Sequence, residues 1–408
     1  MSASLQTRNV LVATGSRANR PEALRNGVPL RFARGQVVDS TEMGGVGELP
    51  NAVAILGGGV IAVEYATVLA ELRVGVTLIC AEGEFMPFLE PTMRAALKAR
   101  MLRDRVLIVH EQVESIQMEQ APALAVSTQK LQRRFKVDML LYSGGRDANS
   151  EGLGCAECGI DVGRYGRIDV HPLTRRTSCS APRTAVFAVG DVTGPPGLAS
   201  SAQQQGRSVA HALFDDLRQP MLSRLEREVL EEQEGERGQG DWVGRGEQEV
   251  EKAGREVEER TEGTLFGSLV GGQSLDAPMT IWTIPEMSSV GEQLCPLFVC
   301  RVRCGVGGVA LFKDMARGRL SGDLDGFLKI VAVQVAGVAR GRPRHRILGV
   351  HIFGDGANEL IQLGSILVHS GATLEQVTNT PFAAVTLSGL FQMASDDALS
   401  QTSTWVEY

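Results

Sequence analysis

The 408-residue chain lacks a long apolar run, a general excess of one charge, and an even number of cysteines. No segment is long and apolar enough to form a membrane-spanning helix. The first ten residues, MSASLQTRNV, lack the apolar core of a secretory signal peptide. Seven cysteines without a secretory signal argue against a disulfide framework. These absences predict a cytoplasmic protein that has no membrane partner.

The net charge of −7 is concentrated in one segment. Residues 223–262 hold 14 acidic and 7 basic side chains, which leaves 34 of the 48 acidic and 34 of the 41 basic residues elsewhere. The rest of the chain is near neutral and offers no electrostatic basis for binding nucleic acid. Residues 217–275 are rich in Glu, Arg, Gly and Gln, and we predict a charged low-complexity insertion there. It is interpreted as disordered or loosely helical, with an acidic interaction segment as the alternative.

The most informative stretch that is present covers residues 51–80. An apolar run at 53–56 meets three consecutive glycines at 57–59, a helical pattern begins at Val60, and a second apolar run follows at 76–79. Strand, glycine turn, helix and second strand therefore occur in the order of a βαβ unit.

The glycine turn matches the dinucleotide-binding motif G-x-G-x-x-G/A, with Gly57, Gly59 and Ala62 in its three positions. Gly57 would permit the tight turn, Gly59 would let a pyrophosphate approach the backbone, and Ala62 would let helix and strand pack closely. The phosphates would then lie at the positive end of the helix. The alternative interpretation is a tight turn in an ordinary α/β unit.

Other apolar runs extend this α/β pattern and then change to an α+β pattern after the charged segment. Strands are predicted over residues 8–13, 106–109, 124–127, 139–142, 185–189, 327–333 and 347–353, and helices over 203–214, 356–369 and from 374 onward.

Short motifs along the chain resemble, in order and spacing, those of the flavin-dependent pyridine nucleotide–disulfide oxidoreductases. The motifs are residues 13–17 (ATGSR), 57–66 (GGGVIAVEYA), 141–146 (LYSGGR) with Asn149, 188–192 (AVGDV), 284–291 (IPEMSSVG), 312–313, 316–317, and 349–354 (GVHIFG). Within that family the resemblance is strongest to the soluble (Si-specific) NAD(P) transhydrogenases. It implies an α/β fold of Rossmann-like FAD- and NAD(P)-binding domains, followed by a C-terminal α+β dimerisation domain, and therefore a homodimer.

The resemblance divides the chain into five parts. They are a remnant of the FAD domain (1–50), the NAD(P)-binding domain (51–137), the second part of the FAD domain (138–216), the charged insertion (217–275) and the dimerisation domain (276–408). Compared with the family, the FAD half is incomplete, because it lacks the family's first GxGxxG and the segment with its redox Cys-x4-Cys. The remaining flavin half is therefore expected to expose strand edges and apolar surface.

The resemblance also implies roles for single residues. Asp191 would contact the ribityl–phosphate region of FAD, with a helix cap as the alternative. Glu64 is the predicted catalytic residue, because the family's glutamate reaches toward the flavin and pairs with a lysine there; a solvated helix glutamate is the alternative. The full set of predicted cofactor contacts is Gly15, Gly57, Gly58, Gly59, Val60, Ile61, Ala62, Glu82, Gly145, Asp191 and Ala202.

The end of the second strand influences the choice between NAD and NADP. An acidic residue there would bind the 2′-hydroxyl of NAD, whereas arginines would accept the 2′-phosphate of NADP. The strand ends at Cys80, which carries no charge, and Glu82 favours NAD. Because a transhydrogenase accepts both nucleotides, the predicted cofactors are FAD, NAD and NADP.

The C-terminal motif separates the candidate reactions. Disulfide-reducing members of the family carry a His-Pro-Thr…Glu segment whose histidine handles the thiol proton. In the matching residues 379–389, Ala384 and Gly389 occupy the places of the histidine and the glutamate. We therefore predict hydride transfer from NADPH through FAD to NAD. A dihydrolipoamide dehydrogenase-like disulfide reductase and a truncated, non-catalytic nucleotide-binding homologue are the alternatives.

Two cysteine pairs have the spacing of functional motifs. Cys295 and Cys300 have redox-pair spacing but occur far from the position of the family's disulfide, and Cys155 and Cys158 lack the two further ligands that zinc requires. We interpret both pairs as ordinary thiols and predict no metal site.

Overall fold

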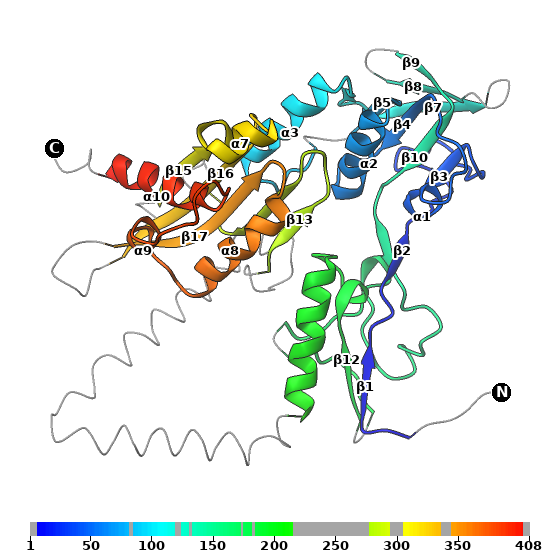
Figure 1. Cartoon of the computed structure of the whole chain (residues 1–408). Coiled ribbons are helices and arrows are strands. Elements are labelled where there is room, and N and C mark those ends of the chain that lie inside the picture. Colours follow the sequence, from blue (N-terminus) through cyan, green and yellow to red (C-terminus); the bar gives the residue numbers. More distant parts are fainter. Residues whose placement is uncertain are drawn as a thin grey trace. The chain divides into compact units, whose positions relative to one another are not determined.

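The computed structural model describes residues 6–80, 85–118, 124–129, 133–172, 174–181, 184–214, 277–293, 305–335 and 344–402. The chain forms two compact units (Figure 1). The first unit comprises Met1–Arg17 and Arg146–Ser274, and the second comprises Ala18–Gly145 and Leu275–Tyr408. The predicted insertion at 217–275 lies outside the described residues.

The second unit begins with a parallel sheet of five strands in the order β3-β10-β4-β5-β6. The strands are β3 (Val37–Asp39), β10 (Met139–Tyr142), β4 (Ala52–Leu56), β5 (Gly75–Ile79) and β6 (Leu107–Val109). The helices that accompany this sheet are α1 (Ser40–Met43), α2 (Val60–Glu71) and α3 (Pro91–Arg103). The strands predicted at 53–56, 76–79, 106–109 and 139–142 are confirmed.

Both faces of this sheet are buried, which explains the continuous apolar run of β4. Val53 and Ile55 pack in the core that contains α2 and α3. Ala54 and Leu56 pack on the opposite side, in a core that includes strand residues Leu124 and Val126. That second core is covered by an antiparallel meander of β7 (Val113–Met118), β8 (Leu124–Thr128) and β9 (Arg134–Val137).

The sheet extends beyond the limits of 51–137 that the sequence predicts for the nucleotide domain. β10 pairs with β4 on one side and with β3 on the other, so residues 37–39 and 139–142 belong to the nucleotide sheet. Pairing between strands about a hundred residues apart leaves no local signal, which is why the predicted limits fall short. The other predicted domain limits stay predictions.

The C-terminal part of the second unit is an antiparallel sheet in the order β13-β14-β17-β16-β15. Its strands are β13 (Met279–Ile281), β14 (Met287–Gly291), β17 (Arg344–Phe353), β16 (Phe327–Val335) and β15 (Gly305–Leu311). The accompanying helices are α7 (Ala316–Ser321), α8 (Ala357–His369), α9 (Leu374–Thr378) and α10 (Gly389–Thr402). The predicted α+β pattern is confirmed.

The two faces of this antiparallel sheet pack against different partners. Leu328, Ile330, Val350 and Ile352 share a core with residues of α8, α9 and α10. Phe327 and Phe353 turn to the other face and join the core of the nucleotide domain beside α3 residues such as Met93. The second unit is therefore held together by a continuous apolar core between its two sheets.

Fewer residues of the first unit are described, and they form two short pairs of strands and one helix. β1 (Asn9–Val12) pairs in parallel with β12 (Ala185–Ala188), and β2 (Ser16–Ala18) pairs with β11 (Arg146–Ala148). Residues 199–214 are helical, which confirms the helix predicted over 203–214. Val10 and Leu11 on β1 are 38% and 44% exposed, in agreement with the predicted exposure of apolar strand surface.

Among the residues that the structure describes, no helix combines the length and the hydropathy that crossing a bilayer requires.

Candidate nucleotide-binding site

The turn between β4 and α2 consists of three glycines, and the first of them closes it. The Gly57 N–H donates a hydrogen bond to the carbonyl oxygen of Ile79 at 3.0 Å, which ties the turn to β5. Gly57 has a φ of 139°, and a Cβ atom there would lie 2.6 Å from the Ser143 Oγ atom. Both the backbone conformation and the space require glycine.

The third glycine leaves the start of α2 open. Gly59 is exposed, it is the N-cap residue of α2, and a Cβ atom built on it would meet no atom within 4 Å. No side chain among the described residues caps the helix, and its first turn contains no acidic residue. The leading N–H groups of a helix have no partner within the helix, and the helix dipole adds positive potential. This end of α2 can therefore bind an anion such as a phosphate.

The remaining small residues of the motif hold the helix close to the sheet. A Cβ atom on Gly58 would lie 3.1 Å from the Cys80 Sγ atom, and the Gly58 carbonyl oxygen accepts the N–H of Met86 at 2.9 Å. Ala62 is fully buried. The structure thus brings Gly57, Gly58, Gly59, Val60, Ile61 and Ala62 together in the arrangement that the motif predicts.

The strands on both sides of β4 end at the same edge of the sheet. β5 continues along the chain on one side of β4, and β10 returns on the other side, so β4 marks the point where the strand order reverses. In open α/β sheets ligands bind outside the carboxyl ends of the strands at such a point. Gly145 lies on this edge beyond β10, where the Ser143 Oγ–H donates to the Leu56 carbonyl oxygen at 2.9 Å.

The end of β5 carries a neutral side chain. Cys80 is 3% exposed, and its Sγ atom lies 3.7 Å from the Gly57 carbonyl oxygen, underneath the glycine turn. Burial raises the pKa of this thiol to about 11, so the thiol is uncharged at neutral pH. Glu82, the residue predicted to favour NAD, lies outside the described residues.

Glu64 contacts a segment that is distant in sequence. Its Oε1 atom accepts the backbone N–H of Trp282 at 2.8 Å, and one turn later the Thr67 Oγ1 atom accepts the N–H of Ile284 at 3.2 Å. Burial raises the pKa of the Glu64 carboxyl group, and the hydrogen bond from Trp282 lowers it by less. No local signal in the sequence pointed to Trp282, because 218 residues separate it from Glu64.

Replacing Glu64 with glutamine is expected to stabilise the fold at neutral pH but not in acid. The raised pKa means that the folded state binds the proton more tightly than the unfolded chain, so the carboxylate lowers stability as pH rises through the folded-state pKa. Glutamine keeps an acceptor for the Trp282 N–H without the charge. Urea unfolding midpoints measured from acidic to neutral pH test this. Glu71→Gln, exposed on the same helix, is the control, and an equal gain at all pH values would contradict the prediction.

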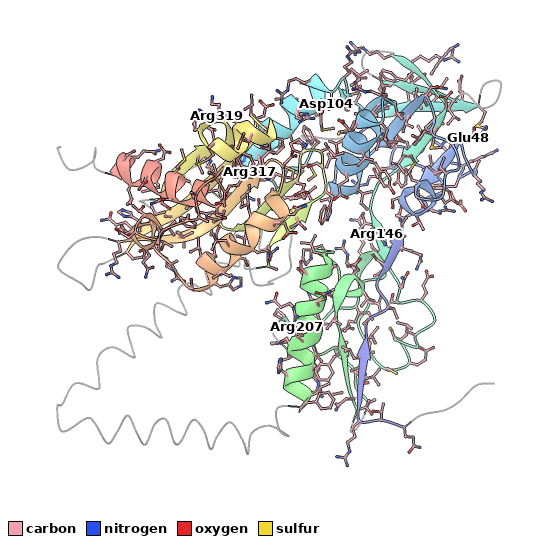
Figure 2. The ribbon with its side chains drawn as sticks, viewed as in Figure 1. Glu48, Asp104, Arg146, Arg207, Arg317 and Arg319 are labelled. Atoms are coloured by element: carbon pink, nitrogen blue, oxygen red, sulfur yellow. The ribbon has the colours of Figure 1, made fainter. Side chains whose placement is uncertain are left out.

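A second group of predicted contacts lies in the first unit. The Asp191 Oδ2 atom accepts the Ser16 Oγ–H at 2.7 Å, directly after Gly15. The Arg146 guanidinium, labelled in Figure 2, donates to the Ser16 Oγ atom at 2.7 Å and to the Ser16 carbonyl oxygen at 2.8 Å. The carboxylate of Asp191 is thereby fixed beside the Gly15 loop.

The loop of Asp191 also adjoins the helix over residues 199–214. A Cβ atom on Gly190 would lie 3.3 Å from the Ala202 Cβ atom, and the Gly190 N–H donates to the Gln205 Oε1 atom at 2.7 Å. Asp191 lies in the short turn η2 (Gly190–Thr193), where it is not a cap of this helix. The predicted contacts Gly15, Asp191 and Ala202 thus belong to one cluster of the first unit.

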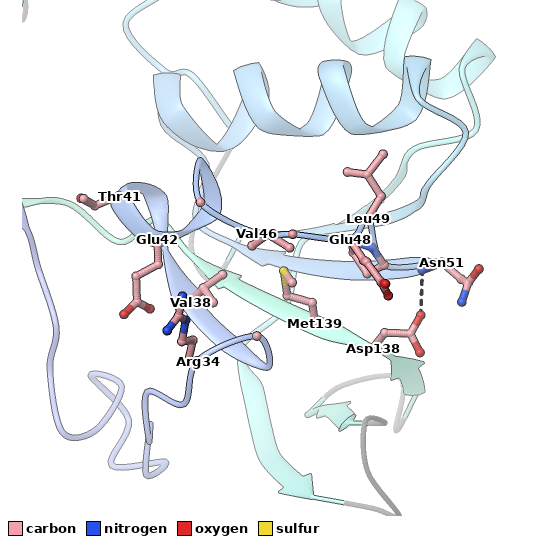
Figure 3. A pocket seen from close by; sticks show the side chains of 14 residues that line it. Arg34, Val38, Thr41, Glu42, Val46, Glu48, Leu49, Asn51, Asp138 and Met139 are labelled. Carbon is pink, nitrogen blue, oxygen red and sulfur yellow. Dashed lines mark hydrogen bonds between the residues drawn. The ribbon is translucent and has the colours of Figure 1, made fainter.

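A hollow of about 770 Å³ lies at the opposite edge of the nucleotide sheet (Figure 3). It is lined by residues at the amino ends of β4 and β10, among them Asn51, Asp138 and Met139. The Asp138 carboxylate accepts the N–H groups of Asn51 and Ala52 at 2.8 and 3.1 Å, so the backbone N–H groups at the start of β4 have hydrogen-bond partners. Because ligands of such sheets bind at the carboxyl ends, this hollow is not the predicted nucleotide site.

The described cysteines Cys80, Cys155, Cys158 and Cys179 are free thiols, and Cys295 and Cys300 lie outside the described residues. Within the part of the chain that the structure covers, no group of His, Cys, Asp and Glu side chains could hold a metal ion.

The loop before α10 contains no residue that could serve as a general base in place of the family's histidine. Ala384 is exposed, and Gly389 is the first residue of α10. A Cβ atom on Gly389 would lie 2.7 Å from the Met315 Cε atom, so a longer side chain there would require Met315 to move.

Two family models match the chain. Residues 2–206 match the model described as pyridine nucleotide-disulphide oxidoreductase, and residues 277–395 match the dimerisation domain of the same family.

Curated relatives match over nearly the whole chain. A soluble pyridine nucleotide transhydrogenase of Yersinia pestis is 31% identical over 401 residues, which is 98% of this chain and 71% of the relative. A protein of the same name from Pseudomonas syringae is 29% identical over 402 residues, or 97% of this chain and 70% of the relative.

Solved structures share the fold. LpdA from Mycobacterium tuberculosis superposes with a TM-score of 0.68 at 21% identity, over 95% of this chain and 69% of that one. The HOCl-induced flavoprotein disulfide reductase RclA from Escherichia coli superposes with a TM-score of 0.68 at 19% identity, over 95% of this chain and 72% of that one.

Proposed function

The chain belongs to the pyridine nucleotide-disulphide oxidoreductase family, and on this premise we propose that it moves hydride from NADPH by way of FAD to NAD, as an Si-specific transhydrogenase. The cofactors of this family are FAD and NAD(P). The relatives at about 30% identity are named soluble pyridine nucleotide transhydrogenases, and their names support this reaction and a cytoplasmic location for the present chain.

The observation that carries the proposal is that, among the residues the structure describes, no side chain caps or covers the start of α2. Gly59 leaves free space in front of the leading N–H groups of Val60, Ile61 and Ala62, and no acidic side chain of the first turn competes for them. A nicotinamide dinucleotide needs this feature, because its pyrophosphate must approach the backbone closely. The neutral thiol of Cys80 supports the use of both nucleotides, since it neither binds a 2′-hydroxyl nor repels a 2′-phosphate as a carboxylate would.

The first unit would hold part of the flavin. Asp191 would contact its ribityl–phosphate region, and the Gly15 loop and Ala202 lie beside that carboxylate. FAD, when bound, supplies the ring that accepts and returns the hydride. The protein's own contribution is to place the nicotinamide nucleotide on α2 and to position Glu64 near the reacting rings.

Disulfide reduction is not proposed, because residues 379–389 contain no group that could take the thiol proton. Ala384 carries no ionisable atom, and the space at Gly389 is limited by Met315. Hydride transfer between two nicotinamides needs no such base. We also propose a homodimer, supported by the match of residues 277–395 to the family's dimerisation domain.

Replacing Gly59 with leucine is expected to weaken nucleotide binding strongly at only a small cost in stability, because leucine is less favoured than glycine at a helix N-cap. The residue is exposed, its φ of −94° suits any side chain, and a Cβ atom there meets nothing within 4 Å. A leucine would fill the space that the pyrophosphate needs, and we expect at least about a hundredfold weaker binding of NADH, or about 2.7 kcal/mol. Calorimetric titration of the full chain with NADH and with NADPH measures this.

The same proteins serve to test the reaction itself. With FAD added, the full chain is expected to transfer hydride from NADPH to a spectroscopically distinct NAD analogue, and Gly59→Leu is expected not to. Leu320→Ala, a change at a 73% exposed residue of α7, is the control. Absence of NADH and NADPH binding by the wild-type chain would refute the site, whereas binding without transfer would refute the reaction alone.

A further inference from the structure

Two cysteines of the first unit lie on a single helical turn. The Cys158 N–H donates to the carbonyl oxygens of Cys155 and Gly154, both at 3.2 Å, and the Ile160 N–H donates to the Cys155 carbonyl oxygen at 2.8 Å. Side chains three residues apart on such a turn are neighbours, with their Cβ atoms about 5–6 Å apart. The backbone therefore places the two thiols on the same side of the turn.

A second segment of the first unit fixes the position of this turn. The Ser180 N–H donates to the Cys158 carbonyl oxygen at 3.0 Å. The Ser178 Oγ atom accepts the Asp161 N–H at 2.8 Å and donates its own hydrogen to the Gly159 carbonyl oxygen at 3.1 Å. The turn is thus held from both of its ends, and the two thiols stay next to each other.

The two thiols differ in their exposure. Cys155 is 8% exposed and belongs to an apolar core that includes Ala148 and Val192, whereas Cys158 is only partly buried at the margin of that core. Burial raises the pKa of the Cys155 thiol, and the negative charges of ionised Cys158 and Glu157 raise it further. A solute can therefore reach Cys158 more easily than Cys155.

We propose that Cys155 and Cys158 are a redox-active dithiol, which small-molecule disulfides such as oxidised glutathione convert into a reversible protein disulfide. This extends the interpretation of the pair as ordinary thiols, and their Cys-x-x-Cys spacing is typical of such dithiols. Cβ atoms joined by a disulfide are about 3.5–4.5 Å apart, so the turn must tighten by about 1–2 Å. A bond formed against such a constraint is readily reduced again, as a regulatory disulfide must be.

The reaction proceeds by two exchanges of thiol and disulfide. The Cys158 thiolate attacks one sulfur of glutathione disulfide and forms a mixed disulfide, and the first glutathione leaves as a thiolate that takes up a proton. Cys155, losing its proton as it attacks, then displaces the second glutathione from the Cys158 sulfur. The protein dithiol loses two electrons and two protons, and one glutathione disulfide is reduced to two molecules of glutathione.

Peptide masses of the full-length protein test this proposal. Tryptic cleavage yields residues 147–164 with both Cys155 and Cys158, whereas Cys179 lies on the separate peptide 177–183. The native protein is equilibrated with glutathione buffers of increasing oxidised fraction, denatured, alkylated and digested. We expect peptide 147–164 to lose two hydrogen atoms and to resist alkylation, and dithiothreitol to restore both thiols. Cys80, which is 3% exposed, is expected to stay reduced and serves as an internal control.

Single variants assign the two roles. Cys155→Ser is expected to retain glutathione on Cys158 and to accumulate at least about tenfold more mixed disulfide than wild type, because the intramolecular second step is lost. Cys158→Ser is expected to take up little glutathione, since Cys155 is buried. Cys179→Ser is the matched control and is expected to form the disulfide as wild type does. The masses of the wild-type peptides decide the proposal even if Cys155→Ser does not fold.

Three results would overturn the proposal. Peptide 147–164 could keep both thiols in the most oxidising buffer, or one of its cysteines could be found linked to Cys179 instead. Wild type could also accumulate as much mixed disulfide as Cys155→Ser, and Cys155 would then not be a resolving thiol. None of these measurements depends on the binding of a nucleotide or a flavin, so they test the dithiol independently of the proposed function.

Discussion

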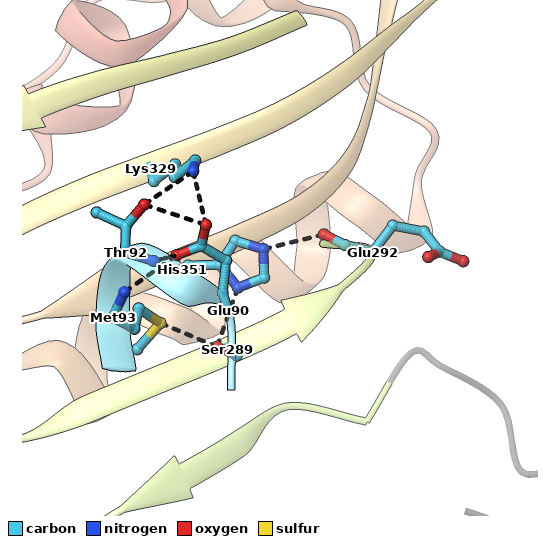
Figure 4. A network of polar contacts seen from close by, with 7 residues as sticks. All are labelled: Glu90, Thr92, Met93, Ser289, Glu292, Lys329 and His351. Carbon is cyan, nitrogen blue, oxygen red and sulfur yellow. Dashed lines mark hydrogen bonds and ion pairs between the residues drawn. The ribbon is translucent and has the colours of Figure 1, made fainter. Parts of the chain in front are cut away.

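Replacing Lys329 with methionine is expected to lower the free energy of unfolding by about 3–5 kcal/mol, the usual effect of removing one partner from a buried ion pair. The Lys329 Nζ atom lies 2.6 Å from the Glu90 Oε1 atom and 3.1 Å from the Thr92 Oγ1 atom (Figure 4). The side chains of Lys329 and Glu90 are 12% and 1% exposed. Methionine fills much of the lysine's volume but leaves the Glu90 carboxylate buried without its cation.

The pH dependence of this effect follows from the pKa of Glu90. Burial raises the pKa of its carboxyl group, but the hydrogen bond and the charge of Lys329, together with the Met93 N–H and the charge of His351, lower the pKa below its ordinary value. The ion pair therefore stabilises the fold above the unfolded-state pKa and loses this contribution as pH falls through the folded-state pKa. Without Lys329 the protonated form of Glu90 is favoured, so the loss of stability should be largest at neutral pH and smaller in acid.

His351 lies near the same pair and changes this comparison in the same direction. It is fully buried between the Ser289 Oγ atom at 3.0 Å and the Glu292 carbonyl oxygen at 2.9 Å. Burial lowers the pKa of its imidazole to about 4, so the ring is neutral at neutral pH. The charge of Lys329 contributes to this lowering, so Lys329→Met lets the imidazole take up a proton more readily, which also makes the loss of stability smaller in acid.

The double variant Glu90→Gln with Lys329→Met isolates the buried charge. Glutamine can still accept the N–H groups of Thr92 and Met93, which Glu90 binds at 2.8 and 3.0 Å as the N-cap of α3. We expect the double variant to recover most of the stability that Lys329→Met loses at neutral pH. Urea unfolding of both variants measures this, and equal losses in the two would show that the carboxylate is not the cause.

The ion pair also shows why the second unit combines two distant parts of the chain. Glu90 begins α3 of the nucleotide domain, and Lys329 lies on β16 of the C-terminal sheet, 239 residues later. The Glu64–Trp282 and Thr67–Ile284 hydrogen bonds connect α2 to the segment after β13 in the same way. Polar contacts thus reinforce the apolar core between the two sheets.

The nucleotide cradle was predictable from the sequence because all its determinants are local. The turn, the start of α2 and the end of β5 lie within thirty residues, and each is specified by a residue type that the backbone requires. Gly57 illustrates this, since its φ of 139° excludes other residues whatever surrounds it. The order of strand, glycine turn and helix therefore also predicted where Gly59 and Ala62 lie.

The contacts around Glu64 and Glu90 could not be predicted from the sequence. Each carboxylate finds its partner more than 200 residues away, and neither Trp282 nor Lys329 has a neighbouring pattern that would indicate a charged or nucleotide-binding site. The short strand β3 was missed for a similar reason. Its three residues are too few to show a period, and only pairing with β10 makes them a strand.

Replacing Gly308 with valine is expected to lower the free energy of unfolding of the second unit by at least about 3 kcal/mol. Gly308 lies on β15 directly against α10, where a Cβ atom would overlap the Ala394 carbonyl oxygen and lie 2.6 Å from the Ala398 backbone nitrogen. Both neighbours are backbone atoms of a helix and cannot rotate away. The helix would have to move off the sheet, which would expose the fully buried Phe391.

Val309→Ala is the matched control, because successive strand residues point to opposite faces. Val309 is 37% exposed, and its backbone N–H still donates to the Asp397 Oδ2 atom at 2.9 Å whatever its side chain is. We expect the free energy of unfolding of this variant to lie within about 1 kcal/mol of the wild-type value. Urea unfolding followed by circular dichroism gives both values, and light scattering shows whether displacing α10 also weakens the proposed homodimer. Equal free energies of unfolding for Gly308→Val and Val309→Ala would mean that β15 and α10 tolerate a wider separation. Close packing of small residues would then not be the cause of the helix's attachment to the sheet.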